Sequence, residues 1–227
     1  QGNIRTWPAA VRQTGGTTFA QTCNALFQVD NETYAGGQPF FRLIMTETER
    51  DLLARLLSTN PTGDAEMNAT FVSVDQVQSR LRYNASVRFR GAGSRGYSPP
   101  NYRVRFPSDR RWDGRTDINV NTRYSYSQVI GSVMTRKAGL TAEDAAAVQV
   151  RVNGVNLAGG STSIQQGSYN HLEDLNADFA ANQFPLDPNG NVYKCLRPSA
   201  SLAYLGTTPQ SYANAGYLKQ SNESEND

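Results

Sequence analysis

The clearest pattern along the chain is an alternation of apolar and polar residues in its middle third. Residues 67–74 and 79–90 alternate with period two, which places apolar side chains on one face of a strand and polar ones on the other. Residues 101–106 repeat the pattern, with Arg103 and Arg105 on the polar face. We therefore predict half-exposed strands whose basic side chains gather on one face of a sheet.

Further strands and helices flank this region. A short apolar run at 39–45 predicts a buried strand, and a capping box at 46–49 opens a helix with leucines along one face. Turn residues at 60–63 should end that helix. Apolar residues at helical spacing predict a second helix at 127–138, with Gly139 as its left-handed C-cap.

The last third contains the remaining elements. Residues 147–152 predict a strand, Asn153 and Gly154 a tight turn, and residues 155–158 a return strand. Residues 169–173 come next, and we assign no type of element to them. The pattern then predicts a short helix at 175–184 and a turn at 189–191 that leads into a strand through Lys194.

This order of elements predicts an α+β fold, a mostly antiparallel sheet with a few packed helices. Residues 1–37 are rich in Gly, Thr, Gln and Asn and predict an N-terminal arm or peripheral hairpin. Residues 38–210 form the predicted main domain. Residues 211–227 lose apolar content and predict a polar, solvated tail or the start of a further lobe.

Composition adds a charge pattern to this outline. No apolar run approaches the roughly 18 residues that span a bilayer, so we predict no membrane span. Net charge is only +2, yet all but three of the 22 basic residues are arginine. Ten arginines lie between residues 80 and 115, against two acids, Asp109 and Asp113. The planar guanidinium suits phosphate or carboxylate, although solvated strand faces explain the same pattern.

The two cysteines, Cys23 and Cys195, lie far apart and lack the CxxC spacing of zinc or redox sites. A disulfide that ties the N-terminal arm to the last strand and two free thiols are equally compatible with the sequence. The chain begins at Gln1 without a leader, as expected for a processed mature protein or an excised part of a longer one.

Residues 91–96 contain a GxGxxG motif, whose glycines allow close backbone approach and whose amides can cradle phosphate. In a dinucleotide-binding fold this motif opens a helix, but Pro99 and Pro100 forbid one and a strand follows. A glycine loop between two strands is the arrangement with which protein kinases cover nucleotide phosphates. A plain flexible hairpin is the competing interpretation.

Several motifs in sequence order resemble the CotH family of atypical kinases. Residues 84–95 and 101–106 resemble the family's strand, glycine/serine/arginine loop and basic strand. The downstream matches are residues 150–154, 169–173, 178–179 and 190–194. The resemblance covers about residues 38–220 and depends on the order of the motifs.

The resemblance implies the nucleotide-binding N-terminal lobe of a secreted or cell-surface kinase, similar to those of spore-coat assembly, with ATP and magnesium as cofactors and a protein as substrate. Five residues match the loop, two are the outward arginines, and one matches the acid that kinases use near the phosphate-binding cation. These implied cofactor-binding residues are Gly91, Gly93, Ser94, Arg95, Gly96, Arg103, Arg105 and Glu173. Neither a catalytic residue nor a metal ligand is assigned.

The chain departs from the family pattern in two ways. Pro99, Pro100, Arg103 and Arg105 stand where the family commonly has lysines, and a forked arginine is not equivalent to a compact ammonium. The family's catalytic and metal-binding acids lie in a following helical lobe, beyond Asp227. We therefore expect no phosphoryl transfer by residues 1–227 alone. The alternative is a non-catalytic extracellular binding or structural module.

If the loop at residues 91–96 binds phosphate, the surrounding side chains should have a particular geometry. The two strands around the loop should be antiparallel neighbours, and Arg95 should face the same space as Arg103 or Arg105. Glu173 should lie within reach of one of these arginines. A Glu173 on the opposite side of the sheet would contradict this site and favour a binding or scaffolding role.

Other groups of polar residues give weaker evidence for a functional site. His171 is the single histidine, which excludes a histidine-pair metal site, and we predict an ordinary loop residue. The acids Glu173, Asp174 and Asp178 suit a helix start better than a metal site. No nucleic-acid motif accompanies the arginine-rich segment, so nucleic acid ranks well below a protein partner.

Overall fold

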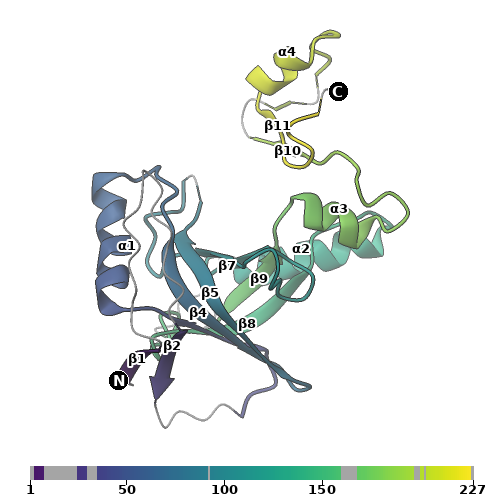
Figure 1. Ribbon diagram of the computed structural model, residues 1–227. Helices are drawn as coiled ribbons and strands as arrows, with labels where there is room; N and C mark the ends of the chain where they lie inside the picture. Colours follow the sequence, from purple (N-terminus) through teal and green to yellow (C-terminus); the bar gives the residue numbers. More distant parts are fainter. Residues whose placement is uncertain are drawn as a thin grey trace.

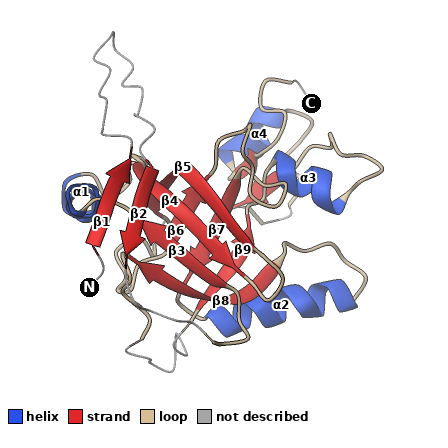
Figure 2. Cartoon of the chain, turned by 60° about the horizontal axis from the view of Figure 1, so that its bottom comes forward, coloured by secondary structure: helices blue, strands red, loops and turns tan. Residues whose placement is uncertain are grey.

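The computed structural model describes residues 3–7, 25–29, 35–91, 93–159, 168–196, 200–201 and 203–225. Seven strands close into a barrel in the order β3-β4-β5-β6-β7-β9-β8 (Figure 1, Figure 2). Their bounds are β3 Phe40–Ile44, β4 Met67–Val74, β5 Ser79–Phe89, β6 Tyr102–Arg105, β7 Asp117–Asn121, β8 Ala145–Val152 and β9 Tyr169–Glu173. Barrel neighbours pair antiparallel, apart from β3 and β8, whose parallel pairing closes the barrel.

Two small sheets and four helices complete the described part of the chain. β1 (Asn3–Trp7) pairs with β2 (Ala25–Val29), and β10 (Tyr193–Cys195) pairs with β11 (Tyr217–Lys219), both antiparallel. The helices are α1 Glu47–Thr59, α2 Ser125–Lys137, α3 Ala177–Gln183 and α4 Pro209–Asn214. The α+β class is therefore correct, but the alternation along the chain gave no sign that the sheet closes on itself.

Period-two alternation explains the barrel interior. Apolar residues of paired strands meet across the register, as Val87 does with Val104 and Val104 with Ile118, and all three side chains are fully buried. Phe41 packs edge-on against Phe71, with ring centroids 5.1 Å apart. These inward residues form one continuous core, which leaves the polar residues of the same strands outside.

His171 belongs to this core, so its prediction as an ordinary loop residue was wrong. It lies in β9, opposite Val120, and its ring packs edge-on against Phe41 and Trp112. Burial, with repulsion from Arg115 added, lowers the pKa of His171 to about 4. The imidazole is therefore neutral at physiological pH.

Local signals set the ends of α1. Thr46 and Glu49 form the predicted capping box, in which the Glu49 amide donates to Thr46 Oγ1 at 3.1 Å. Asn60 is the C-cap: its φ of −149° and ψ of 72° leave the helical region, while its amide makes the last helical hydrogen bond, to the Leu56 carbonyl at 2.9 Å. The turn that follows α1 lies beside the glycine loop, as described below.

Helix α2 forms as predicted but turns its apolar residues outward. Ile130, Val133 and Met134 are exposed, whereas Ser132 is buried and donates to the Glu143 carbonyl at 2.5 Å. Gln128 accepts from Asn170 Nδ2 at 2.7 Å. Polar contacts thus dock this helix on the barrel.

Some of the observed elements differ from the predicted ones in length, or were not predicted. After the turn at Asn153 and Gly154, where both residues have positive φ, the expected return strand is a single bridge between Val152 and Val155. β7 was not predicted, although Ile118 and Val120 alternate with polar residues there. The segment expected to be a polar tail contains β11 and most of α4.

The remaining sequence expectations concern the cysteines and membranes. Cys195 lies exposed in β10 as a free thiol, so it forms no disulfide in this structure, and Cys23 lies outside the described residues. Within the described ranges, no helix has both the length and the apolar character needed to cross a bilayer.

Candidate phosphate-binding pocket

The glycine loop joins β5 to β6, and these strands are antiparallel neighbours as predicted. The Arg90 amide donates to the Asn101 carbonyl at 3.0 Å and closes the hairpin. Gly91 has φ +107°, and a Cβ there would lie 2.2 Å from Ser94 Oγ. Gly93 has no atom within 4 Å of such a Cβ. The loop conformation therefore requires glycine at 91 and not at 93.

Ser94 supports the loop from inside. Its hydroxyl accepts from Asn101 Nδ2 at 3.3 Å, and its carbonyl accepts from the Tyr97 amide at 3.2 Å. At Gly96, no atom lies within 4 Å of the position that a Cβ would take. The serine thus shapes the turn, whereas Gly96 is not sterically required.

The register places arginines from both strands on the outer face of the barrel. Arg88 pairs with Arg103, and Arg105 lies two residues further along β6. Like charges directly opposite repel, so the arrangement needs acids nearby. Arg103 Nε lies 3.0 Å from Asp117 Oδ1, and its Nη2 lies 2.8 Å from Asp174 Oδ2.

Neighbouring acids hold the other arginines. Arg105 lies 3.1 Å from Asp117 and 3.5 Å from Glu66, measured between the charged atoms. Arg88 Nη1 lies 3.0 Å from Asp64 Oδ1. Burial lowers the pKa of Arg88. Burial acts in the same direction on Arg103, but the carboxylates of Asp174 and Asp117 outweigh it and raise the pKa of that guanidinium. These guanidinium groups stay charged.

Arg95 reaches from the glycine loop to the turn after α1. Its Nη1 donates to the Gly63 carbonyl at 2.6 Å, and its Nη2 contacts Asp64 Oδ1 at 2.8 Å. Burial opposes ionisation of Asp64, but Arg95 and Arg88 outweigh it and lower the pKa of that carboxyl. Arg95 Nε is buried without a hydrogen-bond partner.

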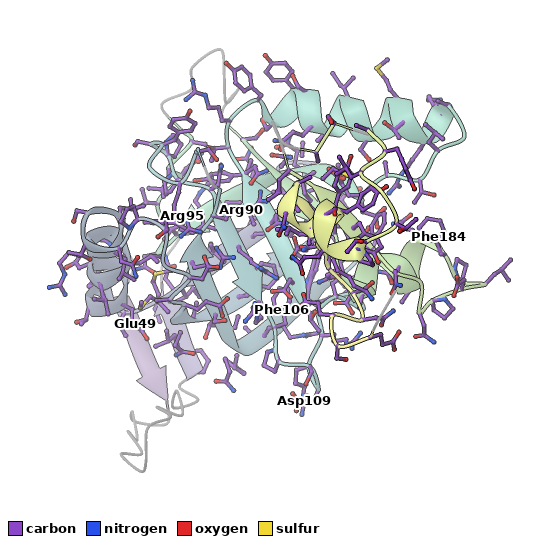
Figure 3. The ribbon with its side chains drawn as sticks, turned by 90° about the horizontal axis from the view of Figure 1, so that it is seen from above. Glu49, Arg90, Arg95, Phe106, Asp109 and Phe184 are labelled. Atoms are coloured by element: carbon purple, nitrogen blue, oxygen red, sulfur yellow. The ribbon has the colours of Figure 1, made fainter. Side chains whose placement is uncertain are left out.

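A cavity of about 640 Å³ lies over these side chains. Figure 3 shows Arg95 on the side of α1 and Arg90 nearer the middle of the barrel. Arg90 donates to Asn121 Oδ1 at 2.6 Å, and burial lowers its pKa. The cavity is lined by five arginines, Gly91 of the glycine loop, the turn after α1, the middle of β7, the residues after β9, and the C-terminal segment. These residues are Arg88, Arg90, Arg95, Arg103, Arg105, Gly91, Pro61, Thr62, Asp64, Asn119, Asp174, Asn176, Lys194, Gln220 and Glu223.

The structure therefore brings together Gly91, Arg95, Arg103 and Arg105, but not Glu173. Glu173 pairs with Ile118, whose side chain is in the core, so it points to the inner side of the sheet, opposite Arg103. The placement of Glu173 in the site was wrong.

Glu173 has its own partners at the barrel end. Its carboxylate lies 3.4 Å from Arg115 Nε and accepts from Asn182 and Gln183 at 2.8 Å. The next residue, Asp174, takes the predicted place beside Arg103, because successive residues of a strand alternate faces. Asp178 binds elsewhere, to Arg111 and Thr116.

Sequence reasoning missed Asp64, Asp174, Asn119 and Lys194 as pocket residues. A strand at 117–121 could have been recognised from its alternation, and it would have placed Asn119 on the outer face. Asp64 and Lys194 come from turns and hairpins that reach the pocket only through the folded chain, so no local pattern marks them.

The pocket suits phosphate and offers little to a metal ion. Several guanidinium groups around a narrow glycine turn present the donors that phosphate oxygens accept. In the described ranges, no group of three or more His, Cys, Asp or Glu side chains could hold a metal ion. Asp64 and Asp174 are each paired with arginine. We therefore assign no side chain to magnesium.

A glycine turn between antiparallel strands, with arginines beneath it, defines a candidate phosphate-binding hairpin on an α+β barrel. The family model described as CotH kinase protein matches residues 87–227, more than half of the chain. The chain therefore belongs to the CotH kinase protein family. A comparison with curated proteins gives no match.

Proposed function

We propose that the arginine pocket binds the phosphate groups of ATP, and that the chain is the nucleotide-binding lobe of a CotH-like protein kinase. The observation that supports this most directly is the convergence of Arg88, Arg95, Arg103 and Arg105 on one cavity beside Gly91. Charge-assisted hydrogen bonds from guanidinium to phosphate are among the stronger polar contacts in proteins. The reaction proposed for the whole enzyme is transfer of phosphate from ATP to a protein.

The residues of the pocket would contact such a ligand in different ways. Arg103 and Arg105 project from a strand and are fixed by Asp117, so they present their remaining donors in a set direction. Arg95 reaches the same cavity from the loop. Gly91 lets the backbone approach the ligand, because a side chain there would collide with Ser94.

Isothermal titration of residues 1–227 with ATP and with inorganic pyrophosphate tests the proposal. Arg105→Gln removes a half-exposed guanidinium from the pocket, and we expect it to weaken binding by about tenfold. Arg55→Gln, an exposed change on α1 with the same loss of charge, is the matched control and should bind as the wild type does. Absence of binding by the wild type, or equal binding by Arg105→Gln, would contradict the proposal.

The second candidate function is a non-catalytic binding or structural module. The position of Glu173 favours it, because this acid faces the barrel interior and contacts Arg115 instead of the pocket arginines, which is the placement expected for a binding or scaffolding role. The same titration separates the two functions, since a scaffold has no need to bind ATP.

We also propose that the protein acts outside the cytoplasm, on the basis of the resemblance to secreted kinases. Fractionation of cells that express the tagged full-length protein tests this. Recovery of the protein in the cytoplasm alone would contradict it.

A further inference from the structure

The C-terminal hairpin places a lysine over the arginine pocket. β10 and β11 pair with Lys194 opposite Leu218, while Tyr193 and Lys219 form the adjacent pair. Because side chains alternate along a strand, Lys194 and Tyr193 face opposite sides. Lys194 lines the arginine cavity, whereas Tyr193 and Lys219 line a separate cavity of about 630 Å³ beside α4.

The hairpin is fixed by its own hydrogen bonds. The Val192 amide donates to Ser221 Oγ at 2.8 Å, and that hydroxyl donates to the Gly190 carbonyl at 3.0 Å. The Gln220 amide donates to the Val192 carbonyl at 2.8 Å. These bonds hold the residue before β10 against the residues after β11. Lys194 is therefore presented from a defined backbone, and not from a loose tail.

Lys194 differs from the arginines that share its cavity. Arg88, Arg95, Arg103 and Arg105 each pair with an acid, and Arg90 donates to Asn121. In the described part of the chain, Lys194 is exposed and shows no ion pair or hydrogen bond. Its ammonium donors therefore remain open to an anion in the cavity.

The hairpin reaches this position by a loop that follows α3, and it stands beyond the end of the barrel in Figure 1. The barrel wall supplies arginines on one side of the cavity and the hairpin supplies Lys194, Gln220 and Glu223 on the other. An anion in the cavity would therefore contact two parts of the chain that come from opposite ends of the matched family segment.

We propose that Lys194 is a ligand-binding residue of the pocket, which contacts ligand phosphate from the side opposite the arginines. This inference rests on the proposed function and adds a residue that the sequence analysis did not assign. The ligand class is a compound with adjacent phosphate groups, for which inorganic pyrophosphate is the simplest probe.

The first test compares pyrophosphate and ATP binding by wild-type residues 1–227, Lys194→Gln and Lys219→Gln. Lys219 lies on the other face of the same hairpin and donates to the Glu225 carbonyl at 3.0 Å, so its replacement is a matched loss of charge. We expect Lys194→Gln to weaken both ligands by about tenfold, as for one charged hydrogen bond. Lys219→Gln should leave binding unchanged.

The second test needs no variant, because the chain has only three lysines, Lys137, Lys194 and Lys219. Acetylation with an N-hydroxysuccinimide ester, read by mass spectrometry, reports the accessibility of each amine. We expect pyrophosphate to slow modification of Lys194 and to leave Lys137 and Lys219 unchanged.

The outcomes separate the two proposals. If the wild type binds pyrophosphate but Lys194→Gln binds equally well and Lys194 is not protected, the role of Lys194 is wrong and the arginine pocket stands. If the wild type binds neither pyrophosphate nor ATP, the proposed function fails and the role of Lys194 fails with it.

Discussion

The carboxylate of Asp64 and the guanidinium of Arg95 form an ion pair, with 2.8 Å between Oδ1 and Nη2. The pair ties the glycine loop to the turn after α1. The same oxygen lies 3.0 Å from Arg88 Nη1, so one carboxylate bridges two cations of the pocket. Asp64 would therefore compete with a phosphate ligand for these two arginines.

Asp64→Asn should therefore tighten the binding of pyrophosphate. The amide keeps the size of the side chain but removes the charge that competes for Arg88 and Arg95. We expect a gain in affinity of about two- to fivefold, the scale of a single exposed charge contact. Titration calorimetry at low ionic strength measures it.

The control for this change is Asp51→Asn, which makes the same change of net charge on the exposed surface of α1. Equal gains in the two variants would mean that net charge alone explains the effect. Weaker binding by Asp64→Asn would mean that Asp64 orients the arginines for the ligand.

Gly91→Ala and Gly93→Ala should differ sharply. At Gly91 a methyl group meets Ser94 Oγ at 2.2 Å and the backbone has φ +107°, so the loop must change shape. We expect Gly91→Ala to cost about 1 to 3 kcal/mol in the free energy of unfolding and to weaken pyrophosphate binding. Gly93→Ala has open space and should change neither quantity. Urea unfolding and titration give both values, and equal behaviour of the two variants would refute the steric role of Gly91.

His171 should make stability depend on pH between about 4 and 6.5. Its pKa is lowered to about 4 in the fold by burial and by Arg115, while Asp144 and Asp113 act weakly in the opposite direction. The folded state therefore binds this proton less readily than the unfolded chain does. The contribution is complete above the unfolded pKa near 6.5, and it is lost as pH falls toward 4. The loss amounts to about 3 kcal/mol.

Urea unfolding of the wild type and of His171→Gln across this pH range measures the effect. Glutamine does not titrate, and the carboxylates that titrate in the same range are common to both proteins. The difference between the two proteins should narrow as pH falls. A constant difference would show that His171 is already charged in the fold.

The sequence predicted the strands well where apolar and polar residues alternate, as in β5 and β6, because the two faces of a strand meet different environments. It did not predict closure of the barrel, since the parallel pairing of β3 with β8 joins segments more than a hundred residues apart. The loop and its arginines were found from local spacing. Glu173 was misplaced because a match to a motif does not fix which face of a strand its acid occupies.

Residues 1–227 should show no transfer of phosphate from ATP to protein, even if they bind ATP as proposed. Of the three acids that line the pocket, Asp64 and Asp174 are held by Arg95 and Arg103, so neither is available to position a metal ion or to accept a proton from a hydroxyl. Glu223, the third, would have to act alone. Phosphoryl transfer depends on such positioning. We expect labelled ATP with magnesium or manganese to give no incorporation into the chain itself or into a basic protein substrate. Metal-dependent incorporation that Arg103→Gln abolishes would overturn this prediction and assign catalysis to the barrel itself.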